Sequence, residues 1–356
     1  MRIAFIQDYL RSGGTENQTI HIADGLAQSG YETHVIVFRK GGALDNLAQS
    51  KSFTLTFLNQ GLLKTDWFAP GLKKRIDSIA PDVVIAMGRM GNCHAGLLCR
   101  SERRYTIVAT FRTGRAIPYL NRKALAEANF LVANSYEALR RLERTYDIKR
   151  EESTVIYNGC IRDFNTSVPS FRNEASVEAP IRLASISMFR PQKMQIRLLQ
   201  ICSKLKTSTP WQLVLAGDGP ELQRCKDEAE KLNIADRVEF TGLLKDPKAL
   251  YYESDIAVHA SRAESLPNFL VEAQMAGLPV IAYNVGGVGE CFVDGESGFL
   301  IEHEDEARFV ERLEYLIDSK AVRLQMSEAA REYAEQHFTP QAQLKAYINL
   351  LRKLKT

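Results

Sequence analysis

The feature that most constrains the fold is an alternation of short apolar runs with amphipathic segments, which occurs twice along the chain. The first series begins with the run RIAFIQDYL and the second with IRLASIS. Strands that alternate with helical segments are typical of a parallel sheet covered by helices. A polar stretch with two prolines and no clear period, Ser167 to Pro180, separates the two series. We therefore predict an α/β protein with two Rossmann-like domains in tandem and a cleft between them.

The domain boundaries follow from where these patterns stop and restart. The predicted segments are a first domain over residues 1–166, a linker over 167–180, a second domain over 181–338 and a final helix over 339–356. Thr339 followed by Pro340 is a good start signal for that helix, since threonine caps a helix and proline suits its first turn.

Composition favours a globular protein that is not embedded in a membrane. Hydrophobic residues make up 45% and charged residues 25% of the chain, which is ordinary for soluble domains. We find no run of about 18 apolar residues, and the opening MRIAFIQDYL resembles a strand more than a signal peptide. We therefore expect a cytoplasmic protein. The six cysteines form no C-x2-C pair, so neither a zinc site nor a disulfide framework is predicted.

Charge is distributed unevenly along the chain. Residues 1–152 hold 22 Lys and Arg against 15 Asp and Glu, and the remainder is net acidic. Much of the excess lies between Arg100 and Lys123. One interpretation is a polyanionic or membrane-surface partner for the first domain; the other is a solvated surface with some pairing between domains. Basic and aromatic residues do not interleave, so nucleic acid is not expected as a partner.

Two glutamates, Glu264 and Glu272, carry the strongest functional signal. Glu264 follows the strand-like run DIAVHAS, and Glu272 lies in a helix that is expected to begin near Pro267. In an open α/β sheet, ligands bind in the crevice outside the carboxyl ends of the strands. The helix N-terminus between the two acids is suited to a phosphate, and the acids suit sugar and ribose hydroxyls. This combination predicts a nucleotide-sugar site, although two solvated surface charges would give the same E-x7-E spacing.

The first strand is followed by a glycine loop, Gly13-Gly14-Thr15-Glu16. Two glycines allow a ligand close to the backbone, and the helix start favours a phosphate; a plain tight turn is the alternative. The loop lacks the third glycine of a dinucleotide fingerprint, and the second strand ends in Arg39-Lys40 instead of an acid, which argues against an NAD enzyme.

Cations follow the first strand of the second domain. Arg190 and Lys193 lie in the loop SMFRPQK, where they could stabilise the charge that builds on a departing diphosphate; two ordinary surface cations would look the same. Further along, Gly217 opens the turn GDGP. For Leu243 and Leu244, after the run RVEF, we expect core packing of the side chains; backbone contacts to a base, which can coexist with it, are what the family resemblance described below implies for this loop.

The context ESLPN…E…MAGLPVIAYNVGGVGE resembles the donor site of retaining glycosyltransferases of family 4, which have the GT-B fold. The GGTE loop, the GDGP turn and Lys193 match the same family. The resemblance covers nearly the whole chain and is stronger in the second domain. It implies a GT-B fold with the C-terminal helix packing back on the first domain.

The resemblance assigns roles to these residues. Glu264 would face the donor sugar as an electrostatic stabiliser, and Glu272 would hold the ribose hydroxyls. Lys193 and Arg190 would complete the catalytic set. The expected donor-binding residues are Gly13, Gly14, Arg190, Lys193, Gly217, Leu244, Leu266, Pro267, Asn268 and Glu272. On the acceptor side we expect Thr15, Glu16, Arg89 and Arg112, and Asp8 and Tyr9 lie near the predicted cleft.

The chain departs from the family pattern at two points. Met188 stands where the family arginine is expected, so Arg190 is the candidate to replace it. Histidines that many members carry in the first domain are absent, and Arg89 and Arg112 occupy those loops. Each arginine either binds an anionic group of donor or acceptor or is a surface charge.

The resemblance therefore implies a retaining hexosyltransferase that needs neither a cofactor nor a divalent metal; no D-x-D motif is present to anchor one. A UDP-sugar is the favoured donor, followed by a GDP-sugar, and the acceptor is a saccharide or lipid-linked saccharide of the bacterial envelope. Peripheral contact with an anionic membrane, at the inner face of the cytoplasmic membrane, would fit the basic first domain. The alternatives are a sugar-nucleotide epimerase or phosphorylase on the same fold, and a non-catalytic or partner-dependent nucleotide-sugar binding subunit.

Overall fold

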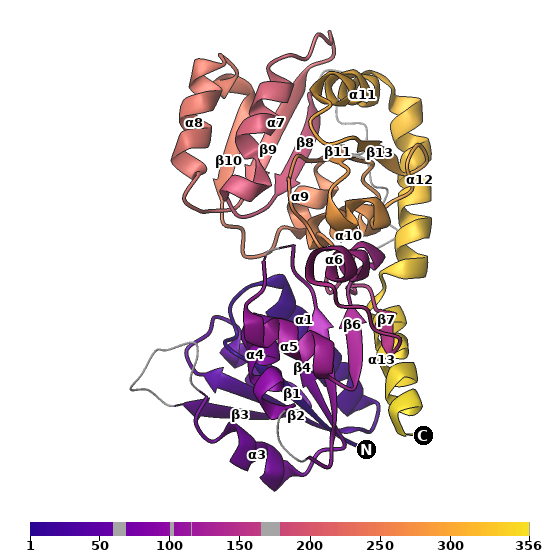
Figure 1. The fold of residues 1–356 in the computed structure, drawn as a ribbon. Coiled ribbons are helices and arrows are strands. Elements are labelled where there is room, and N and C mark those ends of the chain that lie inside the picture. Colours follow the sequence, from indigo (N-terminus) through magenta and orange to yellow (C-terminus); the bar gives the residue numbers. More distant parts are fainter. Residues whose placement is uncertain (60–68, 100–102, 115, 165–178, 356) are drawn as a thin grey trace. The chain divides into compact units, whose positions relative to one another are not determined.

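The computed structural model describes residues 1–59, 69–99, 103–114, 116–164 and 179–355, arranged in two compact units (Figure 1). Unit 1 comprises Met1–Ile161 with Thr339–Thr356, and unit 2 comprises Arg162–Phe338. Most of the predicted linker, residues 167–178, lies outside the described residues. Each unit is an α/β structure built on its own sheet of parallel strands, as the sequence predicts.

The described part of unit 1 contains a parallel sheet in the order β3-β2-β1-β4-β5-β6-β7. Its strands are β1 (Arg2–Gln7), β2 (Glu32–Arg39), β3 (Thr54–Asn59), β4 (Val83–Ala86), β5 (Thr106–Phe111), β6 (Phe130–Ala133) and β7 (Ser153–Val155). Its helices are α1 (Gly14–Gln28), α2 (Asp45–Gln49), α3 (Leu72–Ile79), α4 (Gly88–Leu98), α5 (Tyr119–Glu127), α6 (Tyr136–Tyr146) and α13 (Pro340–Lys355). The central strands are apolar on both faces because helices cover both sides.

The C-terminal helix α13 belongs to unit 1, as the resemblance implies. Tyr347, Leu350 and Leu351 are buried in one apolar cluster with Ile20 and other residues of α1. These contacts remove large apolar side chains from water, and each fully buried side chain of this kind contributes about 1.5–3 kcal/mol. Thr339 caps the helix by accepting from the backbone N–H of Ala342 at 3.1 Å, as its position predicts.

The described part of unit 2 contains a parallel sheet in the order β10-β9-β8-β11-β12-β13. Its strands are β8 (Ile181–Ile186), β9 (Trp211–Ala216), β10 (Val238–Gly242), β11 (Ile256–His259), β12 (Val280–Tyr283) and β13 (Gly298–Ile301). Its helices are α7 (Gln195–Cys202), α8 (Leu222–Lys231), α9 (Lys248–Tyr252), α10 (Asn268–Met275), α11 (Glu306–Asp318) and α12 (Lys320–His337), with short 3-10 turns η1 (Pro191–Lys193), η2 (Ala235–Arg237) and η3 (Gly286–Glu290).

In each sheet the strand order reverses once beside the first strand of the unit. The reversal lies between β1 and β4 in unit 1 and between β8 and β11 in unit 2. The loops that leave two such strands run in opposite directions, which opens a crevice at the carboxyl edge of the sheet. The positions of a ligand site in each unit are therefore set by topology, and the predicted site residues follow these strands.

The packing of α4 on α5 yields a stability prediction. A Cβ atom at Gly96 of α4 would lie 2.3 Å from the backbone oxygen of Leu120. At Gly25 of α1 the nearest atom is the Leu344 side chain at 3.0 Å, which can move. Helix propensity alone would make either Gly→Ala change stabilising by about 1 kcal/mol.

We expect Gly96→Ala to lower the free energy of unfolding by about 1–3 kcal/mol through overpacking. Gly25→Ala, the matched control, should stay within about 1 kcal/mol of the wild type. Urea unfolding followed by far-UV circular dichroism measures both. If Gly96→Ala changed the free energy of unfolding by no more than Gly25→Ala does, the prediction would be contradicted, because the α4–α5 contact would then be able to relax around the added methyl group.

Candidate functional site

The carboxyl edge of unit 2 brings Lys193 and Glu264 together at the reversal of strand order. Lys193 ends η1 after β8, and Glu264 lies in the loop after β11. The Nζ atom of Lys193 is 2.5 Å from Oε1 of Glu264. Two residues that are 71 positions apart in the chain thus form one ion pair. The sequence placed both residues in loops at strand ends, and the fold supplies their contact.

His259 joins this pair and was missed by the sequence analysis. It is the last residue of β11, its side chain is 2% exposed, and its Nε2 lies 2.9 Å from Oε1 of Glu264. Its ring packs against Phe269 of α10, with centroids 5.8 Å apart. A signal was present in the sequence, because a histidine at a strand end five residues before the acid is positioned to reach it.

Two opposing effects determine the pKa of Glu264: burial, and its interactions with His259 and Lys193. Burial by itself would raise the pKa of this carboxyl. The hydrogen bond and charge attraction from His259, followed by the attraction of Lys193, outweigh burial and lower the pKa to about 2. Glu264 is therefore a buried carboxylate that stays ionised at neutral pH.

Glu272 occupies a different environment on α10. Tyr251 donates its hydroxyl to Oε2 of Glu272 at 2.8 Å, and Arg162 donates Nε to the same oxygen at 2.9 Å. Arg162 also pairs with Asp246 at 3.0 Å. Burial raises the pKa of Glu272, and Arg162 and Tyr251 only partly oppose it. No sequence signal pointed to Arg162 as the partner of this acid.

Close backbone packing fixes the loops around the site. A Cβ atom on Gly217 would lie 2.1 Å from the oxygen of Ser187, and one on Gly286 would lie 2.0 Å from the oxygen of Glu264. Both glycines have a positive φ, +142° and +56°, which side chains disfavour. The loop after β9 is thus held against the loop after β8, and the loop after β12 is held against the Glu264 loop.

The helix α10 starts beside Glu264. Leu266 is buried, Pro267 caps the helix in an extended conformation and Asn268 is its first residue. The first backbone N–H groups of a helix lack partners within it and carry a partial positive charge. The predicted phosphate seat therefore lies next to the Lys193–Glu264 pair, although proline contributes no N–H.

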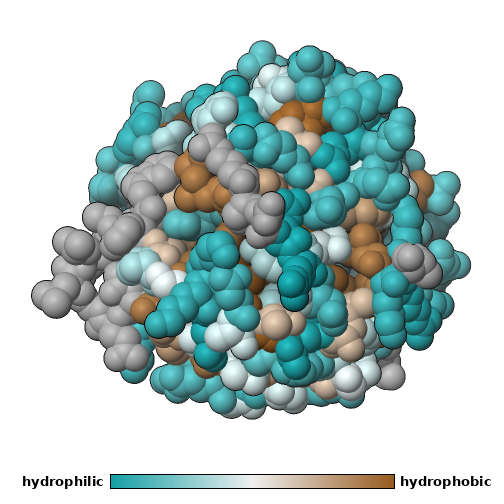
Figure 2. All heavy atoms as spheres, turned by 60° about the horizontal axis from the view of Figure 1, so that its bottom comes forward, coloured by the Kyte–Doolittle hydropathy of each residue, from teal (hydrophilic) through white to brown (hydrophobic). Residues whose placement is uncertain are grey.

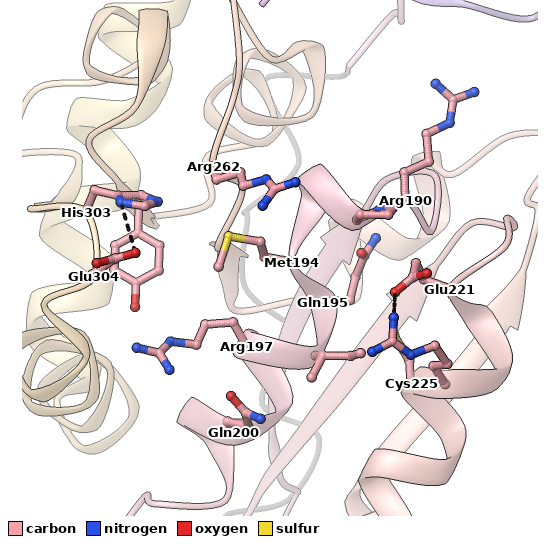
Figure 3. Close-up of a pocket in the computed structure, with 14 residues that line it drawn as sticks. Arg190, Met194, Gln195, Arg197, Gln200, Glu221, Cys225, Arg262, His303 and Glu304 are labelled. Atoms are coloured by element: carbon pink, nitrogen blue, oxygen red, sulfur yellow. Dashed lines mark hydrogen bonds and ion pairs between the residues drawn. The ribbon is translucent and has the colours of Figure 1, made fainter. Parts of the chain in front are cut away.

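The remaining predicted residues of unit 2 are placed less centrally. Arg190 is exposed, and its side chain extends outward, away from Arg197 (Figure 3). Leu244 packs against the apolar cluster that contains Leu250, as expected. The same expectation is wrong for Leu243, which is 69% exposed, because it follows Gly242 at the point where β10 leaves the sheet.

In unit 1, the loops after β1 and β4 meet at the carboxyl edge. Gly13 is the N-cap of α1, and Gly14, Thr15 and Glu16 form its first turn. Burial raises the pKa of Glu16, opposed by its own backbone N–H and by a nearby arginine. A Cβ atom on Gly88, the first residue of α4 after β4, would lie 3.6 Å from the Thr15 side chain. The chain segments that follow β1 and β4 therefore lie next to each other at the carboxyl edge of the unit 1 sheet.

The two arginines predicted on the acceptor side differ in environment. Arg89 is exposed in the first turn of α4. Arg112 donates from Nη1 to the hydroxyl of Tyr347 at 3.2 Å and from Nη2 to the side-chain oxygen of Asn158. It therefore connects the end of β5 to α13, a structural contact that neither interpretation foresaw. Their proposed contact with an acceptor stays a prediction.

Asp8 and Tyr9, after β1, are held by neighbours within unit 1. Asp8 accepts two hydrogen bonds from Arg39, both at 3.0 Å. The hydroxyl of Tyr9 donates to the backbone oxygen of Gly41. Arg39, which replaces the acid of a dinucleotide site in the sequence, is thus part of an ion pair.

Two family models match the chain and together take in most of it. Glycosyltransferase Family 4 matches residues 12–163, and Glycosyl transferases group 1 matches residues 169–333. The chain belongs to the family 4 glycosyltransferases and is an enzyme of the GT-B type.

Similar proteins come from several bacteria. The chain is 26% identical to an "uncharacterized glycosyltransferase" of Haemophilus influenzae, over 94% of this chain and 95% of that protein. It is 25% identical to the lipopolysaccharide core biosynthesis glycosyltransferase LpsE of Rhizobium meliloti, over 96% of each. Among solved structures, Anabaena HepE in complex with UDP has a TM-score of 0.84 at 20% identity, covering 99% of this chain and 100% of that one.

Two features are absent from the described residues. No group of three or more histidine, cysteine, aspartate or glutamate side chains there is arranged to hold a metal ion. In the same residues, no helix has the length and apolar character needed to cross a bilayer.

The opposing environments of the two acids predict a pH dependence of stability. The pKa of Glu264 is about 2 in the folded protein, against an ordinary value of 4.5. Its stabilising contribution is therefore complete above about pH 4.5 and is lost as the pH falls toward 2, because the unfolded chain takes up the proton first. The contribution of Glu272 to stability changes with pH in the opposite sense because its pKa is raised. Glu272 is present in both the wild type and the Glu264→Gln variant compared below, so its contribution cancels in their difference.

We expect the difference in free energy of unfolding between wild type and Glu264→Gln to be largest near pH 7 and to shrink below pH 4.5. Urea titrations at pH 7, 5, 4 and 3 measure it. Glu311→Gln, which alters an exposed ion pair with Arg308, should differ from the wild type by no more than about 1 kcal/mol across this range. A Glu264→Gln difference that stayed constant down to pH 3 would contradict the lowered pKa.

Proposed function

We propose that the protein is a retaining, metal-independent hexosyltransferase that uses a nucleotide-diphosphate sugar, with a UDP-sugar favoured over a GDP-sugar. The observation that carries the proposal is the Lys193–Glu264–His259 cluster beside the N-terminus of α10. It combines a cation, an ionised carboxylate and the backbone N–H groups at the start of a helix, all at one edge of the sheet. A diphosphate with a sugar attached needs each of these.

The nucleoside half of the donor extends toward Glu272. Its carboxylate accepts from the ribose hydroxyls while Tyr251 and Arg162 hold Oε2 in place. Gly217 and Leu244 follow neighbouring strands at the same edge and border the base. The complexes of Anabaena HepE with UDP and with UDP-glucose support a uridine donor.

Charge stabilisation supplies the chemistry in this proposal. As the glycosidic bond breaks, negative charge grows on the diphosphate, and Lys193 and the backbone N–H groups of α10 stabilise it. Positive charge grows on the sugar, and the Glu264 carboxylate stabilises that. The acceptor hydroxyl attacks from the face that the diphosphate leaves, and the leaving phosphate takes its proton. His259 holds the Glu264 carboxylate in position, and Arg190 assists with the diphosphate.

Unit 1 receives the acceptor, with Thr15, Glu16, Arg89 and Arg112 on its acceptor side. The relative LpsE, which acts in lipopolysaccharide core biosynthesis, supports a saccharide or lipid-linked saccharide of the envelope. Contact with the inner face of the cytoplasmic membrane depends on charge, since the surface in Figure 2 is largely hydrophilic with small, separate apolar patches. Basic residues near an anionic surface contribute about 1 kcal/mol each.

One observation favours a second candidate, a nucleotide-sugar binding subunit without activity of its own. Met188 replaces the arginine that the family places after β8, and its side chain is 40% exposed. The site then has one fewer cation to stabilise the diphosphate. Binding with no turnover would be the signature of this candidate, and donor breakdown without an acceptor would indicate an epimerase or phosphorylase.

Donor binding is tested first, by thermal shift with UDP-, GDP-, ADP- and dTDP-sugars. A ligand that binds only the folded state raises the melting temperature by mass action, by an amount equivalent to about 2.7 kcal/mol at 100 times Kd. We expect a UDP-sugar to give the largest shift. Glu272→Ala and the milder Glu272→Gln should lose most of it, each compared with its own ligand-free melting temperature.

The matched control for binding is Glu311→Ala, an exposed glutamate of α11 whose partner is Arg308. It should keep the full shift. If no donor raised the melting temperature of the wild type at millimolar concentration, the proposed donor site would be wrong.

Turnover is tested with the donor that binds. With a panel of saccharide acceptors, we expect UDP release that depends on the acceptor, a product with retained anomeric configuration by proton NMR, and an unchanged rate in EDTA. Glu264→Gln and Lys193→Gln should each lower kcat about 100- to 1000-fold. Loss of activity in EDTA that Mg²⁺ restores would refute metal independence, and an inverted product would refute retention.

A further inference from the structure

Unit 2 contains a cavity whose lining shares one residue, Arg190, with the proposed donor site. Its volume is about 540 Å³, within the range of small-molecule sites. The first turns of α7 and α8, the end of β12 and the loop after β13 enclose it. Arg262, from the loop after β11, completes the lining (Figure 3).

The cavity lies on the opposite face of the sheet from Glu264. Strand side chains alternate between the two faces. Ile281 and Tyr283 of β12 share the apolar cluster of α7, α8 and α11, so Tyr283 points to that side. His259 of β11 is out of phase with Val258, which belongs to the same cluster, and packs on Phe269 of α10. Lys193 and Met194 mark the boundary, since Lys193 pairs with Glu264 while Met194 lines the cavity.

The lining is cationic. Four arginines and one histidine face two glutamates. Of the acids, Glu221 is paired with Arg224 at 2.7 Å, and the Glu304 side chain is 76% exposed. The remaining cations are spread around the cavity: the Arg197 side chain reaches from α7 toward His303, which lies 3.9 Å from Glu304, whereas the Arg262 side chain points away from His303 (Figure 3).

A buried polar atom beside Arg197 points to a missing ligand. Tyr283 is 1% exposed, and among the described residues its hydroxyl has no hydrogen-bond partner of good geometry. The Arg197 guanidinium is close enough to donate toward the Tyr283 oxygen, so it is the Tyr283 O–H proton that lacks an acceptor. Arg197 is itself held by Glu306, with Nε 2.8 Å from Oε2. A buried hydroxyl without a partner costs about 1–3 kcal/mol, which an acceptor oxygen from a ligand would recover.

We propose that this cavity binds a phosphate monoester of about the size of a sugar phosphate. Arg197 and His303 contact the phosphate, the Tyr283 hydroxyl donates to one of its oxygens, and Arg262 contacts the sugar. Gln195 and Gln200, which also line the cavity, suit the hydroxyls of the sugar. The ligand is either a free metabolite or a phosphorylated sugar within a larger saccharide, and both carry the same group.

Calorimetric titration of the full-length protein with glucose 6-phosphate, inorganic phosphate and glucose tests the proposal. We expect glucose 6-phosphate to bind more tightly than inorganic phosphate, and glucose not to bind. Arg262→Gln should weaken the binding at least about tenfold, and Tyr283→Phe, which removes one hydroxyl, about threefold or more. Arg308→Gln, an exposed arginine of α11, should leave Kd unchanged.

Lys193→Gln separates this cavity from the donor site without requiring the proposed function. If the probe binds the cavity, its Kd is the same in Lys193→Gln as in the wild type. A Kd that weakens in Lys193→Gln but not in Arg262→Gln would place the probe beside Glu264 and overturn the proposal, as would no binding of either phosphate at millimolar concentration. A phosphorylated saccharide that binds more tightly than glucose 6-phosphate would identify the larger source.

Discussion

Parallel strands all end at the same edge of their sheet, and this constraint organises the molecule. In unit 2 the order reverses between β8 and β11, so the loops after these strands part at one point. Lys193 comes from one loop and Glu264 from the other. The glycines at positions 217 and 286 allow the flanking loops to pack against them. Lys193, Glu264 and the start of α10 therefore lie close together at the carboxyl edge of the sheet between β8 and β11, because the segments that carry them all leave the sheet at that edge.

The two glutamates show how a protein sets different charge states with one residue type. Glu264 has a cation and a histidine on one oxygen, and its pKa falls to about 2 despite burial. Glu272 has a tyrosine hydroxyl and an arginine shared with Asp246, and burial raises its pKa. The first arrangement suits a carboxylate that must stay charged beside a developing cation. The second suits an acceptor of hydroxyl hydrogen bonds, where a full charge is less important.

Much of this was predictable from the sequence, for identifiable reasons. Strands, helices and the tandem fold follow from apolar periodicity, and Glu264 and Lys193 follow from their positions at strand ends. Contacts between distant segments were not predictable. Arg162 meets Glu272 across 110 positions, and Arg112 meets Tyr347 across 235. A single charged residue in a loop carries no pattern that names its partner. Leu243 was misplaced because its apolar side chain predicted burial, whereas it lies where the chain leaves β10.

The place of α13 has a consequence for biosynthesis. Unit 1 is made of the first part of the chain and of the segment that follows unit 2. Domains generally fold as units, starting from the N-terminal one while the chain is being made. Here the cluster around Ile20 and Ile22 lacks Tyr347, Leu350 and Leu351 until the ribosome has translated all of unit 2. The α1 face therefore remains uncovered through that interval, and exposed apolar surface of this kind favours aggregation until translation ends.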